Sequence, residues 1–428
     1  MLELVSNFDQ EIKFVIGHAG TGKSTKLAQK YTKETLVLTP THKAVAVLHR
    51  KGIEHAFTIH SVLKLVPTLN QNFDPSKNQK MQKLKRIGNV DLDSIKQVFI
   101  DEYSMIPQYV LDLLLEMLPA EASVTVFGDA SQLPPVSGEP IDPLIYTDDI
   151  EYLTTQYRAE APEVVETFER FVHYIEQPRN NADLSMHKDI EVMNLKDAML
   201  KYEYDPEQDI ILAYTNAKTL ELNEVVKKYL GQTELTDIVV NSLDAVVAEP
   251  DNGYDFVYPT CIVKGRLAPE NAEKTEIEID KWNTKIPYKA MTVIIDEEKY
   301  NIFYDLNHYE NSKKMKADVE KWQRKLYADN ELPEGVPLAK WCAQNREVYG
   351  VSQRAKAWKD YLTHQNLVFD VRAPYARTVH KSQGSEYRTV FIAQSDIKKA
   401  IRNGYYIDYS RLMYVALSRA ITRVVIIT

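Results

Sequence analysis

The feature that most constrains this chain is a glycine-rich turn between an apolar stretch and a helix. Gly17-His18-Ala19-Gly20-Thr21-Gly22-Lys23-Ser24 fits G-x-x-x-x-G-K-[ST], in a chain with only 14 glycines among 428 residues. Such a turn lets backbone N–H groups surround phosphates at a helix N-terminus, while the lysine adds charge and the last hydroxyl suits Mg²⁺. Fortuitous glycines could give the same spacing. The apolar residues 11–17 and a helix from Lys23 favour a nucleoside-triphosphate site instead.

Short apolar stretches recur along the chain, separated by segments of helical character. This alternation predicts an α/β fold, in which helices cover both faces of parallel sheets. The expected strands are 11–17, 35–39, 97–100, 123–127, 209–214, 389–393 and 423–427.

The composition excludes several classes of protein. No apolar run approaches the roughly 20 residues of a membrane span, and the N-terminus lacks signal-peptide character, so we expect a cytoplasmic protein without a membrane partner. Cys261 and Cys342 show no metal-ligand pattern, which argues against a zinc site or a disulfide framework. The net charge of −9 does not indicate a nucleic-acid partner, although an acidic protein can carry a basic groove.

Two further strands end in residues that suit nucleotide hydrolysis. After 97–100 come Asp101, which would hold Mg²⁺ through water, and Glu102, which would orient or deprotonate the attacking water. After 123–127 comes a Gly-Asp-Ala-Ser-Gln-Leu-Pro-Pro string, in which Gln132 could sense the γ-phosphate. An Asp-Glu strand end is common and the second string could be an ordinary turn. The phosphate loop upstream favours the catalytic interpretation.

Two stretches interrupt the alternation. Residues 62–95 are polar, and from Lys64 to Arg86 they carry six basic residues against one acidic residue, Asp74. These basic residues could attract phosphates or could form one solvated helix face. Residues 240–370 begin with alternating, strand-like segments and continue with polar helical ones. We therefore expect two cores, each with an inserted accessory piece.

With these motifs in order, later strings of the sequence resemble those of superfamily 1 helicases. Within that superfamily the chain resembles the Dda/RecD branch most. The resemblance lies in the compact size, the first two strings below and the places of both insertions. The strings are Thr39-Pro40-Thr41-His42-Lys43-Ala44 (motif Ia), Thr58-Ile59-His60-Ser61 (Ib), Leu153-Thr154-Thr155-Gln156-Tyr157-Arg158 (IV), Thr378-Val379-His380-Lys381-Ser382-Gln383-Gly384-Ser385-Glu386 (V) and Tyr414-Val415-Ala416-Leu417-Ser418-Arg419-Ala420 (VI).

The resemblance implies two RecA-like P-loop domains with ATP between them. The first would span 1–152, with 62–95 inserted as a strand-separating element and Phe73 as its wedge. The second would combine 153–239 with 371–428. Residues 240–370 would form an inserted domain that begins like a small β-barrel and continues as helices.

The resemblance also assigns roles at the nucleotide. Arg158 and Arg419 would clamp the γ-phosphate from the second domain, because charge on the transferring group must be neutralised from both sides. An ordinary surface ion pair is the alternative for either arginine. Tyr157 would stack on adenine. The catalytic set is then Lys23, Glu102, Gln132, Arg158 and Arg419; the nucleotide-binding set is Gly17, Gly20, Thr21, Gly22, Lys23, Ser24, Thr25, Asp101, Tyr157, Gly384 and Glu386; and Mg²⁺ would bind at Ser24 and Asp101.

One departure from the family concerns nucleotide selectivity. The family usually has an adenine-reading glutamine on a helix upstream of the phosphate loop. Gln10 lies too close to the first strand to serve, so we expect relaxed discrimination between ATP and other nucleoside triphosphates.

A single-stranded DNA track is implied across both domains. Hydroxyl and imidazole groups suit phosphate contacts that position a strand without reading its sequence. The matching residues are Thr41, His42, Thr58, His60, Asn216, Thr378 and His380.

The resulting prediction is an ATP-dependent DNA helicase that moves 5′→3′, unwinds forked duplex and displaces bound protein in replication or recombination. Its partners would be single-stranded DNA, forked duplex, and a single-strand DNA-binding protein or replisome component. We expect a monomer, encoded by a phage and acting in the host cytoplasm. The motifs leave two alternatives open: an RNA helicase of the same superfamily, and an ATP-gated strand-binding mediator that does not unwind.

Overall fold

The structure is a computed structural model of the whole chain. It describes residues 10–69, 82–86, 88, 91–155, 162–178, 184–231, 239–240, 265–267, 277–279, 284–286, 289–295, 298–305, 309–318, 368–370, 375–402 and 405–428. Contacts divide the chain into two compact units. Unit one comprises Met1–Leu63, Val90–Thr233 and Ala373–Thr428, and unit two comprises Lys64–Asn89 and Glu234–Arg372. The insertion boundaries at 62–95 and 240–370, and the domain limits around them, stay predictions.

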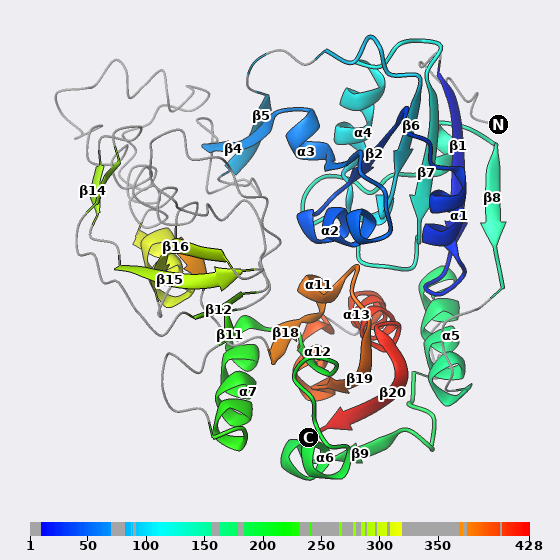
Figure 1. Cartoon of the computed structure of the whole chain (residues 1–428). Helices are drawn as coiled ribbons and strands as arrows, with labels where there is room; N and C mark the ends of the chain where they lie inside the picture. The colour runs from blue at the N-terminus through cyan, green and yellow to red at the C-terminus, as the bar shows by residue number, and fades with distance from the viewer. Residues whose placement is uncertain are drawn as a thin grey trace, which may run out of the picture. The chain divides into compact units, whose positions relative to one another are not determined.

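The first parallel sheet lies in unit one and has six strands in the order β3-β2-β6-β7-β1-β8 (Figure 1). Buried apolar side chains such as Val15, Phe99 and Phe127 pack against Leu27 of α1 and Leu48 of α2. We call this sheet with its helices the first lobe. Its strands are β1 (Glu11–Gly17), β2 (Thr35–Thr39), β3 (Ala56–Thr58), β6 (Gln97–Ile100), β7 (Ser123–Gly128) and β8 (Ile150–Leu153), and its helices are α1 (Lys23–Lys30), α2 (His42–Arg50), α3 (Ile59–Val62), η1 (Tyr103–Met105), α4 (Gln108–Leu115) and η2 (Pro143–Ile145).

The second parallel sheet also lies in unit one and has five strands in the order β18-β10-β19-β20-β9. Alternate strand residues face opposite helical layers, because side chains alternate along a strand. Ile210 and Val390 pack with α5 and α13, whereas Ile211 and Phe391 pack with α6 and α7. We call this sheet with its helices the second lobe. It comprises α5 (Pro162–Glu176), β9 (Glu191–Met193), α6 (Leu195–Lys201), β10 (Ile210–Ala213), α7 (Asn216–Tyr229), β18 (Ala376–Thr378), α11 (Val379–Ser382), β19 (Tyr387–Ile392), α12 (Gln394–Ile397), η4 (Lys398–Ala400), α13 (Ile407–Leu417) and β20 (Ala420–Ile427).

Two parallel sheets with helices confirm the predicted α/β fold. The described parts of unit two are mainly antiparallel. They are the hairpin β4 (Leu65–Leu69) and β5 (Gln82–Arg86), the pair β13 (Ile277–Ile279) and β14 (Thr284–Ile286), a helix at 309–318, and a sheet of β11 (Val239–Val240), β12 (Gly265–Leu267), β15 (Lys289–Ile295), β16 (Glu298–Asp305) and β17 (Val368–Asp370).

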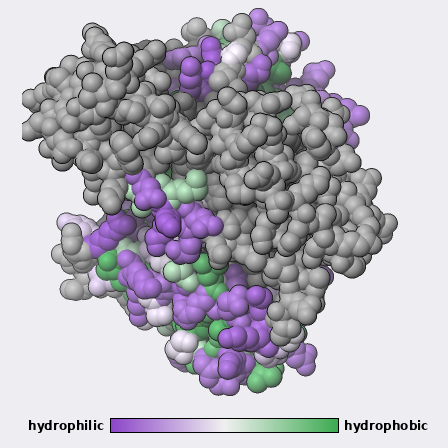
Figure 2. Space-filling view, turned by 90° about the vertical axis from the view of Figure 1, so that its left-hand side faces the viewer, coloured by the Kyte–Doolittle hydropathy of each residue, from purple (hydrophilic) through white to green (hydrophobic). Residues whose placement is uncertain are grey.

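The surface is consistent with this burial of apolar residues in the two cores. On the face shown in Figure 2, the described residues are largely hydrophilic, and hydrophobic ones are interspersed among them. No helix in the described ranges has the length and apolar character that crossing a bilayer requires.

A buried amide fastens the outer edge of the second sheet. The side chain of Asn223, on α7, accepts from the backbone N–H of Ala376 at 2.7 Å and donates to its carbonyl at 3.3 Å. Asn223 is 3% exposed, so water does not easily replace either bond. The pairing satisfies the backbone N–H and carbonyl of Ala376 in edge strand β18, which ends at Thr378 and is followed by His380.

We expect Asn223→Ala to lower the free energy of unfolding by about 1–3 kcal/mol, because it leaves buried backbone groups without partners. Urea denaturation would measure the change. The matched control is Glu224→Ala on the exposed face of the same helix, where the ion pair with Lys227 is worth at most about 0.5 kcal/mol. Equal effects of the two substitutions would contradict the account of Asn223.

Candidate nucleotide and strand site

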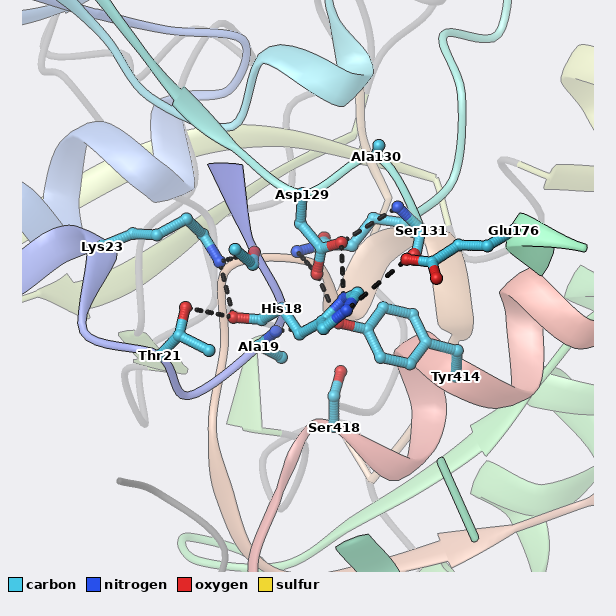
Figure 3. Close-up of polar contacts among 12 residues, drawn as sticks. His18, Ala19, Thr21, Lys23, Asp129, Ala130, Ser131, Glu176, Tyr414 and Ser418 are labelled. Carbon is cyan, nitrogen blue, oxygen red and sulfur yellow. Dashed lines mark hydrogen bonds and ion pairs between the residues drawn. The ribbon is translucent and has the colours of Figure 1, made fainter. Parts of the chain in front are cut away.

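The phosphate loop joins the end of β1 to the start of α1. Gly22 caps α1 with φ 84°, a left-handed conformation that glycine adopts without strain. Gly17 is required for a different reason, since a Cβ there would lie 2.9 Å from the backbone oxygen of Leu153. The Lys23 ammonium donates to the carbonyls of Gly17 at 2.5 Å and His18 at 2.8 Å. The phosphate loop therefore holds the ammonium of its own lysine through loop carbonyls (Figure 3).

A cavity of about 670 Å³ opens at this loop. The volume suits a nucleotide-sized ligand. Both lobes contribute to its lining, and the sequence predicted most of the polar residues and three of the glycines found there. These are Gly20, Thr21, Gly22, Lys23, Ser24, Thr25, Asp101, Glu102 and Gln132 from the first lobe and Gly384, Glu386 and Arg419 from the second.

The carboxylates of Asp101 and Glu102 follow β6 directly. Burial, together with the charge of Glu102, raises the pKa of Asp101 to about 7. Glu102 has φ 55°, a left-handed conformation that is strained for a residue with a side chain. One of its carboxylate oxygens is buried and accepts no hydrogen bond from any described residue. Such a buried carboxylate pair is suited to a cation and a bound water.

Gln132 and Arg419 approach the cavity from different lobes. Gln132 is 2% exposed, and its side-chain oxygen accepts from the Gln383 amide at 3.5 Å. Arg419 is 3% exposed. Its guanidinium donates to the carbonyls of Val415 at 3.2 Å and Ser385 at 3.4 Å and to the Ser418 hydroxyl at 3.0 Å. These bonds fix the guanidinium within the second lobe while it lines the cavity.

A buried polar network that the sequence did not predict connects the lobes beside the phosphate loop (Figure 3). The Tyr414 hydroxyl accepts from the Ala19 N–H at 2.8 Å and donates to the Asp129 carboxylate. Nδ1 of His18 lies 3.7 Å from Asp129, and its Nε2 lies 3.6 Å from Glu176 of α5. Asp129 and Tyr414 stand inside the helicase-like strings, but nothing in their local spacing indicated a shared contact.

The residues predicted to contact single-stranded DNA lie at the carboxyl ends of β-strands in both sheets. Thr39 pairs with Thr58, so Thr41, just after β2, and Thr58, the last residue of β3, lie at the ends of neighbouring strands of the first sheet. Ala213 pairs with Thr378, so Asn216, shortly after β10, and Thr378, the last residue of β18, lie at the ends of neighbouring strands of the second sheet. Carboxyl ends of parallel strands are the usual binding edge of such sheets.

The three threonines act as helix caps in the described contacts. Their hydroxyls accept from Ala44 N–H at 3.2 Å (Thr41), Ser61 N–H at 3.2 Å (Thr58) and Lys381 N–H at 3.4 Å (Thr378). The His380 side chain is exposed and lies with its ring centroid 6.1 Å from that of Tyr214. His60 is half-buried.

Several predicted residues lie outside the described ones. Tyr157, Arg158 and Phe73 are among them, and so is the side chain of His42. Their roles stay predictions.

Comparison with known proteins supports the resemblance that the motifs carry. A model described as an AAA domain matches residues 3–138, and a model described as the C-terminal domain of UvrD-like helicases matches residues 374–427. The ATP-dependent DNA helicase Dda of Enterobacteria phage T4 is 25% identical over 437 residues, covering 94% of this chain and 91% of the relative. These matches support a Dda/Pif1-like superfamily 1 helicase. The resemblance drawn from the motifs is thereby confirmed, and the phage origin stays a prediction.

A second helicase sequence and a solved helicase structure also align with most of the chain. The ATP-dependent DNA helicase Pif1 of Campylobacter jejuni is 22% identical over 439 residues, covering 95% of this chain and 86% of the relative. A crystal structure of a Bacteroides Pif1 helicase with ADP-AlF3 and single-stranded DNA aligns with a TM-score of 0.45 and 17% identity, covering 98% of this chain and 89% of that one.

The charge environment of His18 predicts a pH dependence. The nearby Asp129 carboxylate, 3.7 Å from Nδ1, together with the charge of Glu176, raises the pKa of His18, although burial and Lys23 oppose this. Protonated His18 therefore stabilises the fold below about pH 6.5, and this contribution disappears as the pH rises through the folded-state pKa. His18→Gln should accordingly destabilise the chain more at pH 5.5 than at pH 8.5. Urea denaturation midpoints at the two pH values measure this, and an equal cost at both would contradict it.

Proposed function

We propose that this chain is an ATP-dependent DNA helicase that moves 5′→3′ along single-stranded DNA and separates forked duplex. The general activity follows from its family. The observation that supports the proposal most strongly is that Lys23 of the phosphate loop and Arg419 of the second lobe line the same cavity. A site built from two lobes lets the nucleotide bias their arrangement, which is what a translocating motor requires.

We propose that phosphate binding uses the loop and its lysine. Lys23 now donates to two backbone carbonyls. A triphosphate would draw the ammonium toward the β- and γ-phosphates, because charge-assisted hydrogen bonds to phosphate are stronger than those to neutral carbonyls. The backbone N–H groups at the start of α1 would bind the phosphates from the other side. Mg²⁺, held by Ser24 and Asp101, would neutralise charge on the β- and γ-phosphates.

We propose that hydrolysis uses groups from both lobes. Glu102 would orient the attacking water and accept its proton, a role suited to its buried carboxylate oxygen without a described partner. Gln132 would detect the γ-phosphate, and Arg419 with Arg158 would neutralise the charge on the transferring group. Tyr157 would stack on adenine, with Gly384 and Glu386 beside the nucleotide.

We propose that the strand crosses the carboxyl edges of both sheets. The hydroxyls of Thr41 and Thr378 accept in their described caps, which leaves an O–H able to donate to a phosphate oxygen. The Thr58 hydroxyl instead donates to the Ser61 hydroxyl at 2.9 Å, so Thr58 would order the turn before His60. His42, Asn216 and His380 complete the proposed contacts. Protein partners would be a single-strand DNA-binding protein or a replisome component, with the helicase acting as a monomer in replication or recombination.

Lys23→Ala should abolish ATP hydrolysis, by about 100-fold or more, while affinity for a DNA strand stays largely unchanged, because only the phosphate contact is lost. A coupled ATPase assay and fluorescence anisotropy measure the two quantities. Lys30→Ala, on the exposed last turn of the same helix, is the matched control. Continued turnover by the Lys23 variant would show that the nucleotide site is assigned wrongly.

Arg419→Ala should lower kcat by about 100-fold or more but change the affinity for ATP by only a few-fold, because an arginine that meets the γ-phosphate acts mainly in the transition state. Steady-state kinetics and binding of a fluorescent ATP analogue separate the two. Arg423→Ala is the control, since Arg423 stacks on Tyr202, with 4.3 Å between its guanidinium carbon and the ring centroid. Comparable losses of turnover and binding would argue against the clamp.

Forked substrates test the activity itself. Duplexes with a 5′ or a 3′ single-stranded tail, made of DNA or RNA, should be unwound only when the tail is DNA with a free 5′ end. Unwinding of RNA would favour the RNA helicase. Strand-stimulated hydrolysis without unwinding would favour the mediator.

A further inference from the structure

Helix α13 contacts the first lobe at two points on one face, one helical turn apart. Arg411 reaches the loop after β7, and Tyr414 reaches both that loop and the phosphate loop. We propose that Tyr414, supported by Arg411, is a positioning residue that sets the register of Arg419 against the phosphate loop. The proposal rests on the proposed function, because it concerns the same hydrolysis site.

The Tyr414 contact is buried and directional. The residue is 0% exposed, and its hydroxyl accepts from Ala19 N–H at 2.8 Å while donating to Asp129. Burial, with the nearby Asp129 charge, raises the pKa of Tyr414 well above its ordinary value, so the phenol keeps the proton it donates. One hydroxyl thus joins the backbone of the phosphate loop, the loop after β7 and α13, as Figure 3 shows.

Asp129 extends this contact toward the γ-phosphate sensor. Its carboxylate accepts from the Ser131 N–H at 2.9 Å and lies 3.5 Å from the Gln132 amide nitrogen. Burial alone would raise the pKa of Asp129, but His18, Lys23 and Tyr414 together hold it below its usual value. A charged carboxylate therefore orders the turn that carries Gln132.

Arg411 holds the same turn from its backbone side. Its Nη1 donates to the carbonyls of Ala130 at 2.6 Å and Gln132 at 2.5 Å. The positions of Arg411 and Tyr414 differ by three residues, which places both side chains on one face of α13. Two separated attachments resist rotation of the helix as well as its translation.

Arg419 follows α13 closely and depends on its placement. Its backbone N–H donates to Ala416 at 3.3 Å, and its Nε donates to Val415 at 3.2 Å. A displacement of the last turn of α13 therefore displaces the guanidinium. Catalytic geometry is sensitive on this scale, since a misplacement of about 1 Å can reduce a rate about 100-fold.

Apolar packing around the Tyr414 ring allows a substitution that removes the hydroxyl and leaves the ring in place. Ala19 and Leu133 of the first lobe belong to the same buried cluster as Tyr414, whose ring lies edge-on to Phe168 at 5.9 Å between centroids. Tyr414→Phe keeps this packing and removes only the hydroxyl. Tyr409→Phe is the matched control: Tyr409 is also on α13, is 3% exposed, and uses its hydroxyl to accept from Gln394 at 2.9 Å.

In strand-stimulated ATP hydrolysis by the full chain, we expect Tyr414→Phe to lower kcat by about 10-fold to 100-fold, with the KM for ATP within about threefold. Tyr409→Phe should stay within about twofold of the unaltered chain in both parameters. A purely structural role would instead make the two variants alike, with lowered thermal stability and unchanged kcat for the folded protein. That result would overturn the proposal.

Arg411 supplies a second test that does not need the tyrosine variant to fold. Arg411→Met removes both bonds to the turn, whereas the ammonium in Arg411→Lys can still donate to carbonyls. We expect kcat to fall in the methionine variant and to recover partly in the lysine variant, at similar strand affinity. Equal kcat in the two would contradict the proposal. Absence of hydrolysis by the unaltered chain would instead refute the proposed function, so the two failures are distinguishable.

Discussion

The parallel direction of all strands in both sheets is the constraint on which the rest of the structure depends. Parallel strands end at the same edge, so the residues that leave them are brought together although they are far apart in sequence. In the first lobe this edge gathers the phosphate loop, Asp101 and the turn that carries Gln132. In the second it gathers Asn216, Thr378 and His380. The parallel direction of the strands therefore positions both the residues proposed for hydrolysis and those proposed to contact DNA.

Buried side chains of both signs of charge lie in and beside the cavity, where the dielectric constant is low. Lys23 and Arg419 are cations buried within it, and Asp101 and Asp129 are buried carboxylates in or beside it. Hydrogen bonds compensate the charges of Lys23, Arg419 and Asp129, which is the condition for keeping ions away from water. The compensation also joins the lobes, since the Tyr414 hydroxyl lies between Ala19 and Asp129. The same network of hydrogen bonds therefore compensates buried charge and connects the two lobes.

Burial on both faces explains which strands the sequence predicted. The interior strands β1, β2, β6 and β7 of the first sheet, and β10, β19 and β20 of the second, all coincide with predicted apolar stretches. The edge strands were missed: they are β3, β8, β9 and β18. An interior strand is a continuous apolar run, whereas a short edge strand owes its conformation to one neighbour and can be polar. Glu191 in β9 and Arg377 in β18 illustrate this.

The sequence by itself determined the local chemistry: a lysine and hydroxyl at a helix start, two carboxylates at a strand end, and an arginine after α13. Each depends on spacing along a few residues, which backbone geometry converts directly into position. Only the tertiary structure decided that Tyr414 meets Ala19, 395 residues away, and that Arg411 reaches the loop that carries Gln132. Contacts between distant residues arise from how sheets and helices pack, and no local period encodes that packing.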